Sequence, residues 1–128
     1  MQLNDPEALA GMKAAFDRYE VALNENDVAV LDDTFRVADE TVRYGVNEHL
    51  YGHAEIAVFR AARPPQAMRQ LCRTHFTTYG PDYGIAWVEF TRPGMTRMGR
   101  QTQTWVRFSD EGQDGGWKVV AAHVSLVG

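Results

Sequence analysis

The sequence predicts a single α+β domain in which three helices come first and pack against a curved, mainly antiparallel sheet. Two observations carry this prediction. Apolar residues recur at helical spacing in the first half of the chain, whereas long runs rich in β-branched and aromatic residues fill the second half. With 128 residues, 45% of them hydrophobic, the chain suffices for one buried core, so residues 1–128 are expected to form one domain.

The first helix is predicted to be long and amphipathic. Asp5 supplies an N-cap and Pro6 occupies the first helical position, where a missing amide hydrogen costs nothing. Apolar and aromatic residues then recur at alternating spacings of three and four, at Leu9, Met12, Phe16, Tyr19 and Leu23.

Two short helices around a small hairpin are expected next. Asn26 is predicted to cap the first of these helices, over a segment with apolar residues at Val28, Leu31 and Phe35. The hairpin strands are expected at 41–44 and 47–51. Helical character returns over 53–63 until the Pro64-Pro65 pair stops it.

Four longer strands are predicted at 68–79, 84–92, 97–108 and 117–127, separated by turn sequences at 80–82, 93–94 and 110–116. Such an order predicts a meander with the helices on one face. Each of the last three strands carries one tryptophan, which we expect to serve as core or interface: Trp87, Trp105 and Trp117.

Composition excludes several classes of function. Thirteen basic and seventeen acidic residues are interspersed, giving a net charge of -4, so no nucleic-acid partner is expected. The sequence shows neither a secretory signal nor a membrane span, which favours a cytoplasmic protein without a membrane partner.

His49 and His53 are four residues apart, but Tyr51-Gly52 would break the helix that this metal-ligand spacing requires, so no metal and no cofactor are expected. Cys72 is expected to be a buried strand cysteine.

Five local strings carry a family resemblance. They are Arg18-Tyr19-Glu20, Arg43-Tyr44-Gly45, the segment 59–63, the segment 99–105 and the segment 117–125. Together and in this order they resemble the AtzH-like branch of the SnoaL-like, nuclear transport factor 2-like (NTF2-like) superfamily, a branch that includes the HpxZ proteins of oxalurate catabolism. The resemblance covers essentially the whole chain.

This resemblance implies a cone-shaped cystatin-like fold with one small-molecule pocket, in a homodimer encoded near an amidase. The AtzH type is described as a decarboxylating amidohydrolase of 1,3-dicarboxyurea in cyanuric acid breakdown, without a cofactor. Family members are expected to use a tyrosine of the first helix and an arginine of the first strand as the catalytic pair. These match Tyr19 and Arg43.

The residues themselves leave alternatives open for this pair. Tyr19 lies on the apolar face of the first helix, where it serves either the pocket or an ordinary core with its hydroxyl bonded to a backbone carbonyl. Arg43 either faces inward, where its charge needs a carboxylate, or outward on a solvated edge. Strand parity alone does not choose between these orientations.

Five further residues are candidates for substrate binding. Arg63 follows Arg60 by one helical turn, a pattern that in isolation indicates a solvated face, but the family string favours a substrate role for Arg63. Phe59 and Trp87 are candidate pocket walls, as is His75 on the third strand. His123 is either a second acid/base group or a residue packed at the dimer interface.

The leading functional hypothesis is therefore a hydrolase of carboxylated ureas in ureido, s-triazine or oxalurate catabolism, that is, nitrogen catabolism. The main alternative is a non-catalytic dimeric module that binds a small molecule and assists an amidase. Isomerase chemistry of the ketosteroid type ranks last, because Glu89 or Asp17 would have to supply a carboxylic acid beside the pocket.

Overall fold

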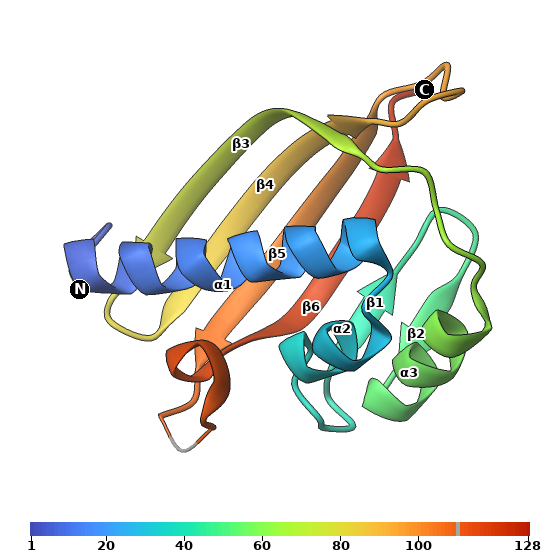
Figure 1. The fold of residues 1–128 in the computed structure, drawn as a ribbon. Helices are drawn as coiled ribbons and strands as arrows, with labels where there is room; N and C mark the ends of the chain where they lie inside the picture. Colours follow the sequence, from blue (N-terminus) through green and yellow to red (C-terminus); the bar gives the residue numbers. More distant parts are fainter. Residues whose placement is uncertain (110) are drawn as a thin grey trace.

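The structure is a computed structural model that describes residues 1–109 and 111–128, and these residues form three α-helices on one six-stranded mixed sheet (Figure 1). The helices are α1 (Pro6–Glu25), α2 (Val28–Thr34) and α3 (His53–Ala62). The strands are β1 (Val42–Tyr44), β2 (His49–Tyr51), β3 (Gln70–Tyr79), β4 (Tyr83–Thr91), β5 (Gly99–Arg107) and β6 (Trp117–Leu126). The predicted α+β class and order of elements are confirmed, and Asp110 of the last predicted turn lies outside the described residues.

The strands pair in the order β2-β1-β6-β5-β4-β3, with every pairing antiparallel except the parallel β1–β6 contact. The long strands β3 to β6 form the meander that the turn sequences predicted. Helix α1 runs across one face of these strands, while α2 and α3 lie beside the short strands β1 and β2 (Figure 1). The two faces of the sheet therefore have different surroundings.

The ends of the first two helices correct one expectation. Asp5 caps α1 as predicted, because its carboxylate accepts a hydrogen bond from the Ala8 amide at 3.0 Å. Asn26 does not cap α2. It adopts the left-handed conformation at the C-terminus of α1 (φ 55°), which asparagine tolerates better than most residues, and Asp27 caps α2 instead.

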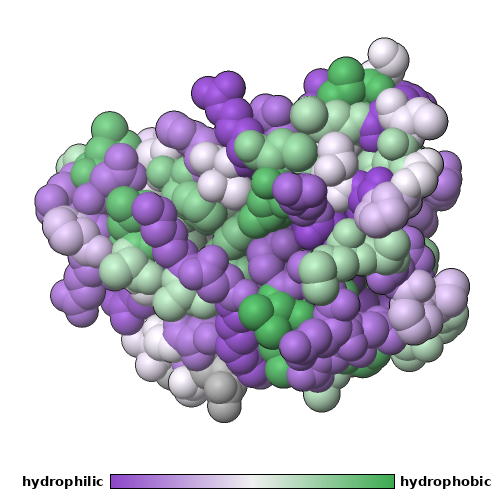
Figure 2. All heavy atoms as spheres, turned by 45° about the horizontal axis from the view of Figure 1, so that its top comes forward, coloured by the Kyte–Doolittle hydropathy of each residue, from purple (hydrophilic) through white to green (hydrophobic). Residues whose placement is uncertain are grey.

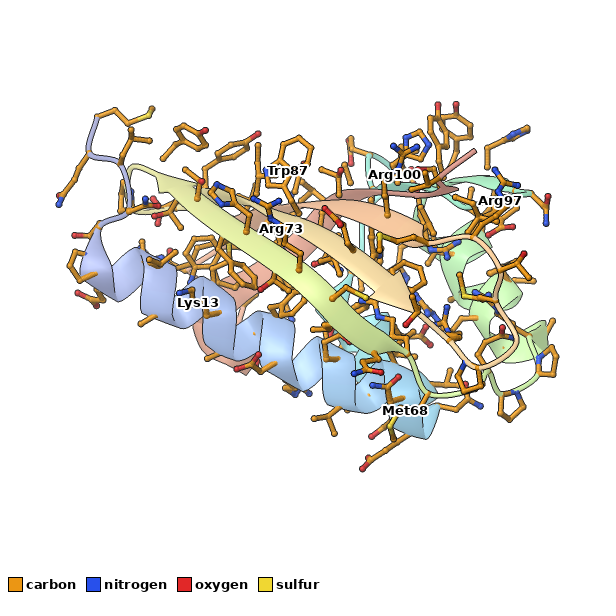
Figure 3. The ribbon with its side chains drawn as sticks, turned by 90° about the horizontal axis from the view of Figure 1, so that it is seen from above. Lys13, Met68, Arg73, Trp87, Arg97 and Arg100 are labelled. Atoms are coloured by element: carbon orange, nitrogen blue, oxygen red, sulfur yellow. The ribbon has the colours of Figure 1, made fainter. Side chains whose placement is uncertain are left out.

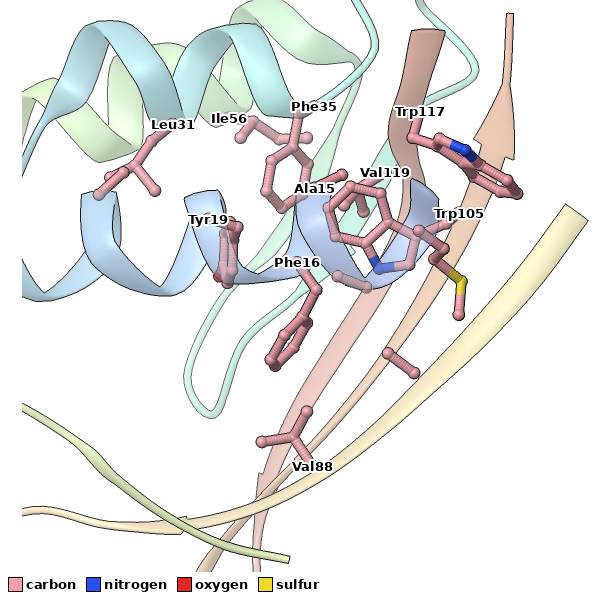
Figure 4. Close-up of a cluster of buried hydrophobic side chains, with 14 of the residues drawn as sticks. Ala15, Phe16, Tyr19, Leu31, Phe35, Ile56, Val88, Trp105, Trp117 and Val119 are labelled. Carbon is pink, nitrogen blue, oxygen red and sulfur yellow. The ribbon is translucent and has the colours of Figure 1, made fainter. Parts of the chain in front are cut away.

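The core lies between α1 and the inner face of the sheet. Phe16 and Tyr19 of α1 belong to this core together with Phe35, Trp105 and Trp117 (Figure 4). These aromatic side chains are almost fully buried. The helical spacing of the first element thus produces the buried face that it predicted.

Alternation along the strands divides the remaining side chains between the two faces. Gln101, Gln103 and Trp105 of β5 face α1 and are buried. Trp87 and Arg100 lie on the opposite face, here called the outer face (Figure 3). Trp87, with 50% of its surface exposed, is thus the tryptophan of the three that does not belong to the core.

Cys72 is exposed, contrary to expectation. It lies on the edge strand β3, at an irregularity of the pairing between Leu71 and Arg73. An edge strand is covered less than a central one, so β-rich composition alone did not ensure burial.

The surface view in Figure 2 shows hydrophilic residues over most of the face turned forward, with smaller groups of hydrophobic residues among them. No helix in the described part of the chain is both long enough and apolar enough to cross a membrane.

Candidate active site

Tyr19 occupies the centre of the candidate site. The packing of α1 against the sheet leaves only 2% of this residue exposed, with its ring 6.2 Å from that of Phe35. Its hydroxyl oxygen accepts a hydrogen bond from the side-chain amide of Gln101 at 3.4 Å. Over residues 1–109 and 111–128 that hydroxyl has no backbone carbonyl partner, so the environment differs from that of an ordinary core tyrosine.

Three buried arginines from separate segments surround Tyr19. Arg43 comes from β1, Arg60 from α3 and Arg69 from the segment before β3, and they are 6%, 5% and 5% exposed. Arg43 pairs across the sheet with buried Ala122, which places both on the inner face. The inward alternative for Arg43 is therefore the observed one.

Two glutamates compensate part of this positive charge. Glu20 forms an ion pair with Arg69 through both of its oxygens, one of them 3.1 Å from the Arg69 Nε. Glu48 accepts a hydrogen bond from the Arg43 Nη1 at 2.9 Å. Both pairs belong to the immediate surroundings of Tyr19.

Arg60 is compensated less well than its neighbours. Among the described residues it has no carboxylate at salt-bridge distance, although Asp32 is near enough for its charge to be felt. Its Nη2 and the Arg43 Nε are buried without a hydrogen-bond partner in this part of the chain. Buried donors are normally paired, so these two nitrogens indicate a place for an anionic ligand.

Two further arginines, Arg63 and Arg92, extend the cluster toward the surface, where each is half-buried. Burial lowers the pKa of Arg63, and the charge of Arg43 lowers it further. Burial also lowers the pKa of Arg92, with Arg69 as the next cause. Guanidinium groups stay protonated at neutral pH despite such shifts, so the cluster carries a high positive potential.

This potential acts on Tyr19. Burial alone would raise the pKa of the Tyr19 hydroxyl, because a charged phenolate is poorly solvated in the core. The charges of Arg60 and Arg69, the hydrogen bond from Gln101 and the charge of Arg43 outweigh burial, so the pKa is lowered. Tyr19 is therefore a stronger acid than a free tyrosine.

Aromatic rings support the guanidinium groups. The Phe59 ring lies between Arg43 and Arg63, at 5.4 and 5.5 Å from their guanidinium carbons. The Phe90 ring lies 4.7 Å from the guanidinium of Arg69. Such cation–π contacts fix the direction of the cations without neutralising them.

The comparisons with known proteins agree with this architecture. A model of the AtzH-like family matches residues 1–128. The chain belongs to the AtzH-like family. A protein of unknown function from Pectobacterium atrosepticum is similar, with 52% identity, a TM-score of 0.91 and coverage of 98% of this chain and 95% of that one. A cystatin-like fold protein from Burkholderia xenovorans is 42% identical, with a TM-score of 0.92 and coverage of 99% and 97%.

More distant structures share the fold alone. A putative ketosteroid isomerase from Parabacteroides distasonis is 12% identical over 91% of this chain and 87% of that one, with a TM-score of 0.70. No curated protein matches the chain. The NTF2-like, cystatin-like fold expected from the sequence is confirmed by these neighbours.

The structure brings together only some of the predicted site residues of this AtzH-like chain. Tyr19 and Arg43 converge, with Phe59 and Arg63 adjacent to Arg43. The other three candidates, His75, Trp87 and His123, line a hollow of about 650 Å³ on the outer face. The sheet separates those three from Tyr19.

Neither carboxylate that isomerase chemistry would need lies beside Tyr19. Glu89 lines the outer face, and Asp17 is exposed on α1. In the described residues, moreover, no group of three histidine, cysteine, aspartate or glutamate side chains is arranged to hold a metal ion.

Sequence reasoning missed Arg69, Glu20 and Gln101 as site residues and assigned Arg60 to a solvated face. The alternation of Gln101 and Gln103 with Arg100 and Thr102 was a usable signal, because it places two amides on the same face as Trp105. Arg69 had no comparable signal.

Proposed function

We propose that this protein is a cofactor-independent enzyme that cleaves a C–N bond of a small carboxylated urea, a substrate of the 1,3-dicarboxyurea type. One observation carries the proposal: a buried tyrosine of lowered pKa lies among three buried arginines, two of which have a nitrogen without a partner in the described part of the chain. Membership of the AtzH-like family supports the same reading.

The arginines are proposed to bind the charged ends of the substrate. A carboxylate placed against Arg43 and Arg63 would meet two cations beside the Phe59 ring, and planar guanidinium groups bind carboxylates with two hydrogen bonds. Arg60 is then free to donate to the urea carbonyl oxygen, where negative charge develops as the C–N bond breaks.

Tyr19 is proposed to move the proton. When the bond between nitrogen and the carboxyl carbon breaks, the electron pair stays on nitrogen and a proton must be delivered there. The Tyr19 hydroxyl supplies that proton, and the carboxyl group leaves as carbon dioxide. The tyrosinate that remains is stabilised by the arginines that lower its pKa.

The alternative is a binding module that assists an amidase without turnover. The unpaired nitrogens of Arg43 and Arg60 favour anion binding whether or not a reaction follows. The two functions differ in the consequence of Tyr19→Phe, which removes the proton donor but leaves the arginines in place.

The test is release of carbon dioxide, the product of the proposed step, from 1,3-dicarboxyurea and related N-carboxylated ureas, with oxalurate, which has no N-carboxyl group, as a comparison substrate. Wild-type protein is expected to turn over at least one of them, and Tyr19→Phe and Arg43→Ala are expected to be inactive while folded. Tyr83→Phe and Arg97→Ala are matched controls, because both residues are exposed and Arg97 donates to the Val127 carbonyl instead of facing Tyr19. Ligand binding without turnover by wild-type protein would favour the binding module.

We also propose that the outer face forms a homodimer interface. Paired strands align His75, Trp87, Thr102 and His123 in one row across the sheet. A second row runs through Arg73, Glu89 and Arg100, in which charge alternates in sign. Such a row can pair with its own copy around a two-fold axis, and the half-exposed Trp87 would supply the apolar centre.

A further inference from the structure

The Tyr19 hydroxyl is linked by hydrogen bonds to a network of polar side chains that has no role in the reaction proposed above. Arg69 donates from its Nη1 to the Gln101 side-chain oxygen at 2.9 Å, and the Gln101 nitrogen donates to the Tyr19 oxygen at 3.4 Å. Glu20 holds Arg69 from the other side through two contacts. The chain Glu20–Arg69–Gln101–Tyr19 thus starts and ends on adjacent residues of α1.

The direction of every hydrogen bond in this chain is fixed by chemistry. A guanidinium group has no acceptor, so the atom of Gln101 that faces Arg69 must be the amide oxygen. The amide nitrogen then necessarily faces Tyr19 and donates to it. The assignment does not depend on the usual ambiguity between the two ends of a glutamine side chain.

This direction determines where the Tyr19 proton points. The phenolic oxygen receives a hydrogen from Gln101, and the arginines around it are also pure donors. Within the described residues no acceptor lies within hydrogen-bond distance of the hydroxyl. Its single proton is therefore left to a bound ligand, or is lost when the hydroxyl ionises.

We propose that Gln101, oriented by Arg69 and Glu20, is a positioning residue that directs the Tyr19 proton toward the bound ligand and stabilises the tyrosinate left after transfer. This inference rests on the proposed function for the identity of the acceptor, but the orientation of Gln101 does not. The amide acts through Tyr19 and need not touch the substrate.

Charged groups from every neighbouring element surround Tyr19. Five arginines interact with it electrostatically: Arg43 on β1, Arg60 on α3, Arg63 just after α3, Arg69 before β3 and Arg92 after β4. Three carboxylates interact with those arginines: Glu20 on α1, Asp32 on α2 and Glu48 before β2. A test must therefore change the amide while leaving all these charges in place.

Gln101→Met meets this requirement, because it removes the amide and keeps the length and charge of the side chain. Gln103→Met is the matched control. Gln103 is buried on the same face of the same strand, but its oxygen accepts from the Trp105 indole at 2.9 Å instead of facing Arg69. Both variants lose one buried amide.

The ionisation of Tyr19 is measured by fluorine NMR of fluorotyrosine-labelled protein as a function of pH, with the signal assigned by its absence in Tyr19→Phe. At a fixed pH within the titration, Gln101→Met is expected to lower the tyrosinate-to-tyrosine ratio about tenfold, the effect of losing one hydrogen bond to a charged oxygen. Gln103→Met is expected to match wild type. Equal ionisation in Gln101→Met and wild type, or equal shifts in both variants, would overturn the proposal.

Gln101→Glu provides a second variant of nearly the same size that retains the pairing with Arg69. It places a negative acceptor beside the Tyr19 hydroxyl, so the tyrosinate fraction should fall further than in Gln101→Met. A rise would overturn the proposal. These measurements need no substrate, so they separate the two proposals. If only the proposed enzymatic function were wrong, turnover would be absent while the tyrosinate fraction still decreased from wild type to Gln101→Met to Gln101→Glu.

Discussion

Replacing Arg60 with methionine should leave the fold as stable as wild type or slightly more stable, while weakening anion binding. Arg60 is 5% exposed, one of its nitrogens has no partner among the residues that the structure describes, and burial lowers its pKa. Burying a poorly compensated charge costs several kcal/mol, and exchanging buried ion pairs for apolar residues often stabilises proteins by about 1–4 kcal/mol. Because the exchange also removes the contact with the Phe35 ring at 5.6 Å, we expect a change of about 0 to +1 kcal/mol in the free energy of unfolding.

Arg69→Met is the matched comparison and should behave in the opposite way. Arg69 is equally buried, but it pairs with Glu20 and donates to Gln101. Removing it leaves the Glu20 carboxylate without its buried partner, which typically costs about 3–5 kcal/mol. The two substitutions thus have the same chemistry and differ only in how well the cation is paired.

The assay is urea unfolding at neutral pH for both variants, followed by thermal unfolding with and without malonate as a small dicarboxylate probe. Malonate should raise the melting temperature of wild-type protein by mass action and raise that of Arg60→Met by less, because Arg43 and Arg63 remain. If Arg60→Met were destabilised as strongly as Arg69→Met, or responded to malonate as strongly as wild type, Arg60 would be a structural cation with no part in an anion site.

Three further outcomes are expected. Trp87→Glu should convert the proposed dimer to a monomer in light scattering without unfolding it, since Trp87 is half exposed, and a persistent dimer would place the interface elsewhere. Gly99→Ala should lower the free energy of unfolding by about 1–3 kcal/mol, because the added methyl group would overlap the Phe90 ring that contacts Arg69. An unchanged midpoint of urea unfolding would contradict this. The pKa of Tyr19 in the folded state lies below its ordinary value of 10.0, so ionisation of Tyr19 should stabilise wild-type protein relative to Tyr19→Phe above pH 10. This advantage in stability should disappear as the pH falls through the folded-state pKa. A stability difference between the two proteins that does not vary with pH would refute this expectation.

The order of elements was predictable because each signal was local. The Asp5-Pro6 start, the spacing of three and four in α1 and the glycine and proline turns each involve a few neighbouring residues. The exceptions arose where context decides. Asn26 is favoured both as an N-cap and in the left-handed conformation, and the fold of α1 selected the second. Cys72 has strand composition, but only the sheet order shows that its strand lies at the edge.

The outer-face residues show a limit of a different kind. His75, Trp87 and His123 were correctly expected to lie on strands, but a residue type suited to a pocket is equally suited to an interface. Parity along one strand defines two sets of side chains without saying which set faces the helices. That choice depends on where α1 packs, which no single strand contains.

The arginine cluster is harder still, because its members come from segments that meet only in the folded chain. Arg60 and Arg69 look like surface residues in sequence, and the residues alone left the orientation of Arg43 open, because burying any one of these cations alone would be unfavourable. The fold tolerates them because Glu20 and Glu48 offset two of the charges. The remaining positive charge around Tyr19 is a cost that an anionic ligand can offset, so the least favourable part of the core is the part that most strongly indicates function.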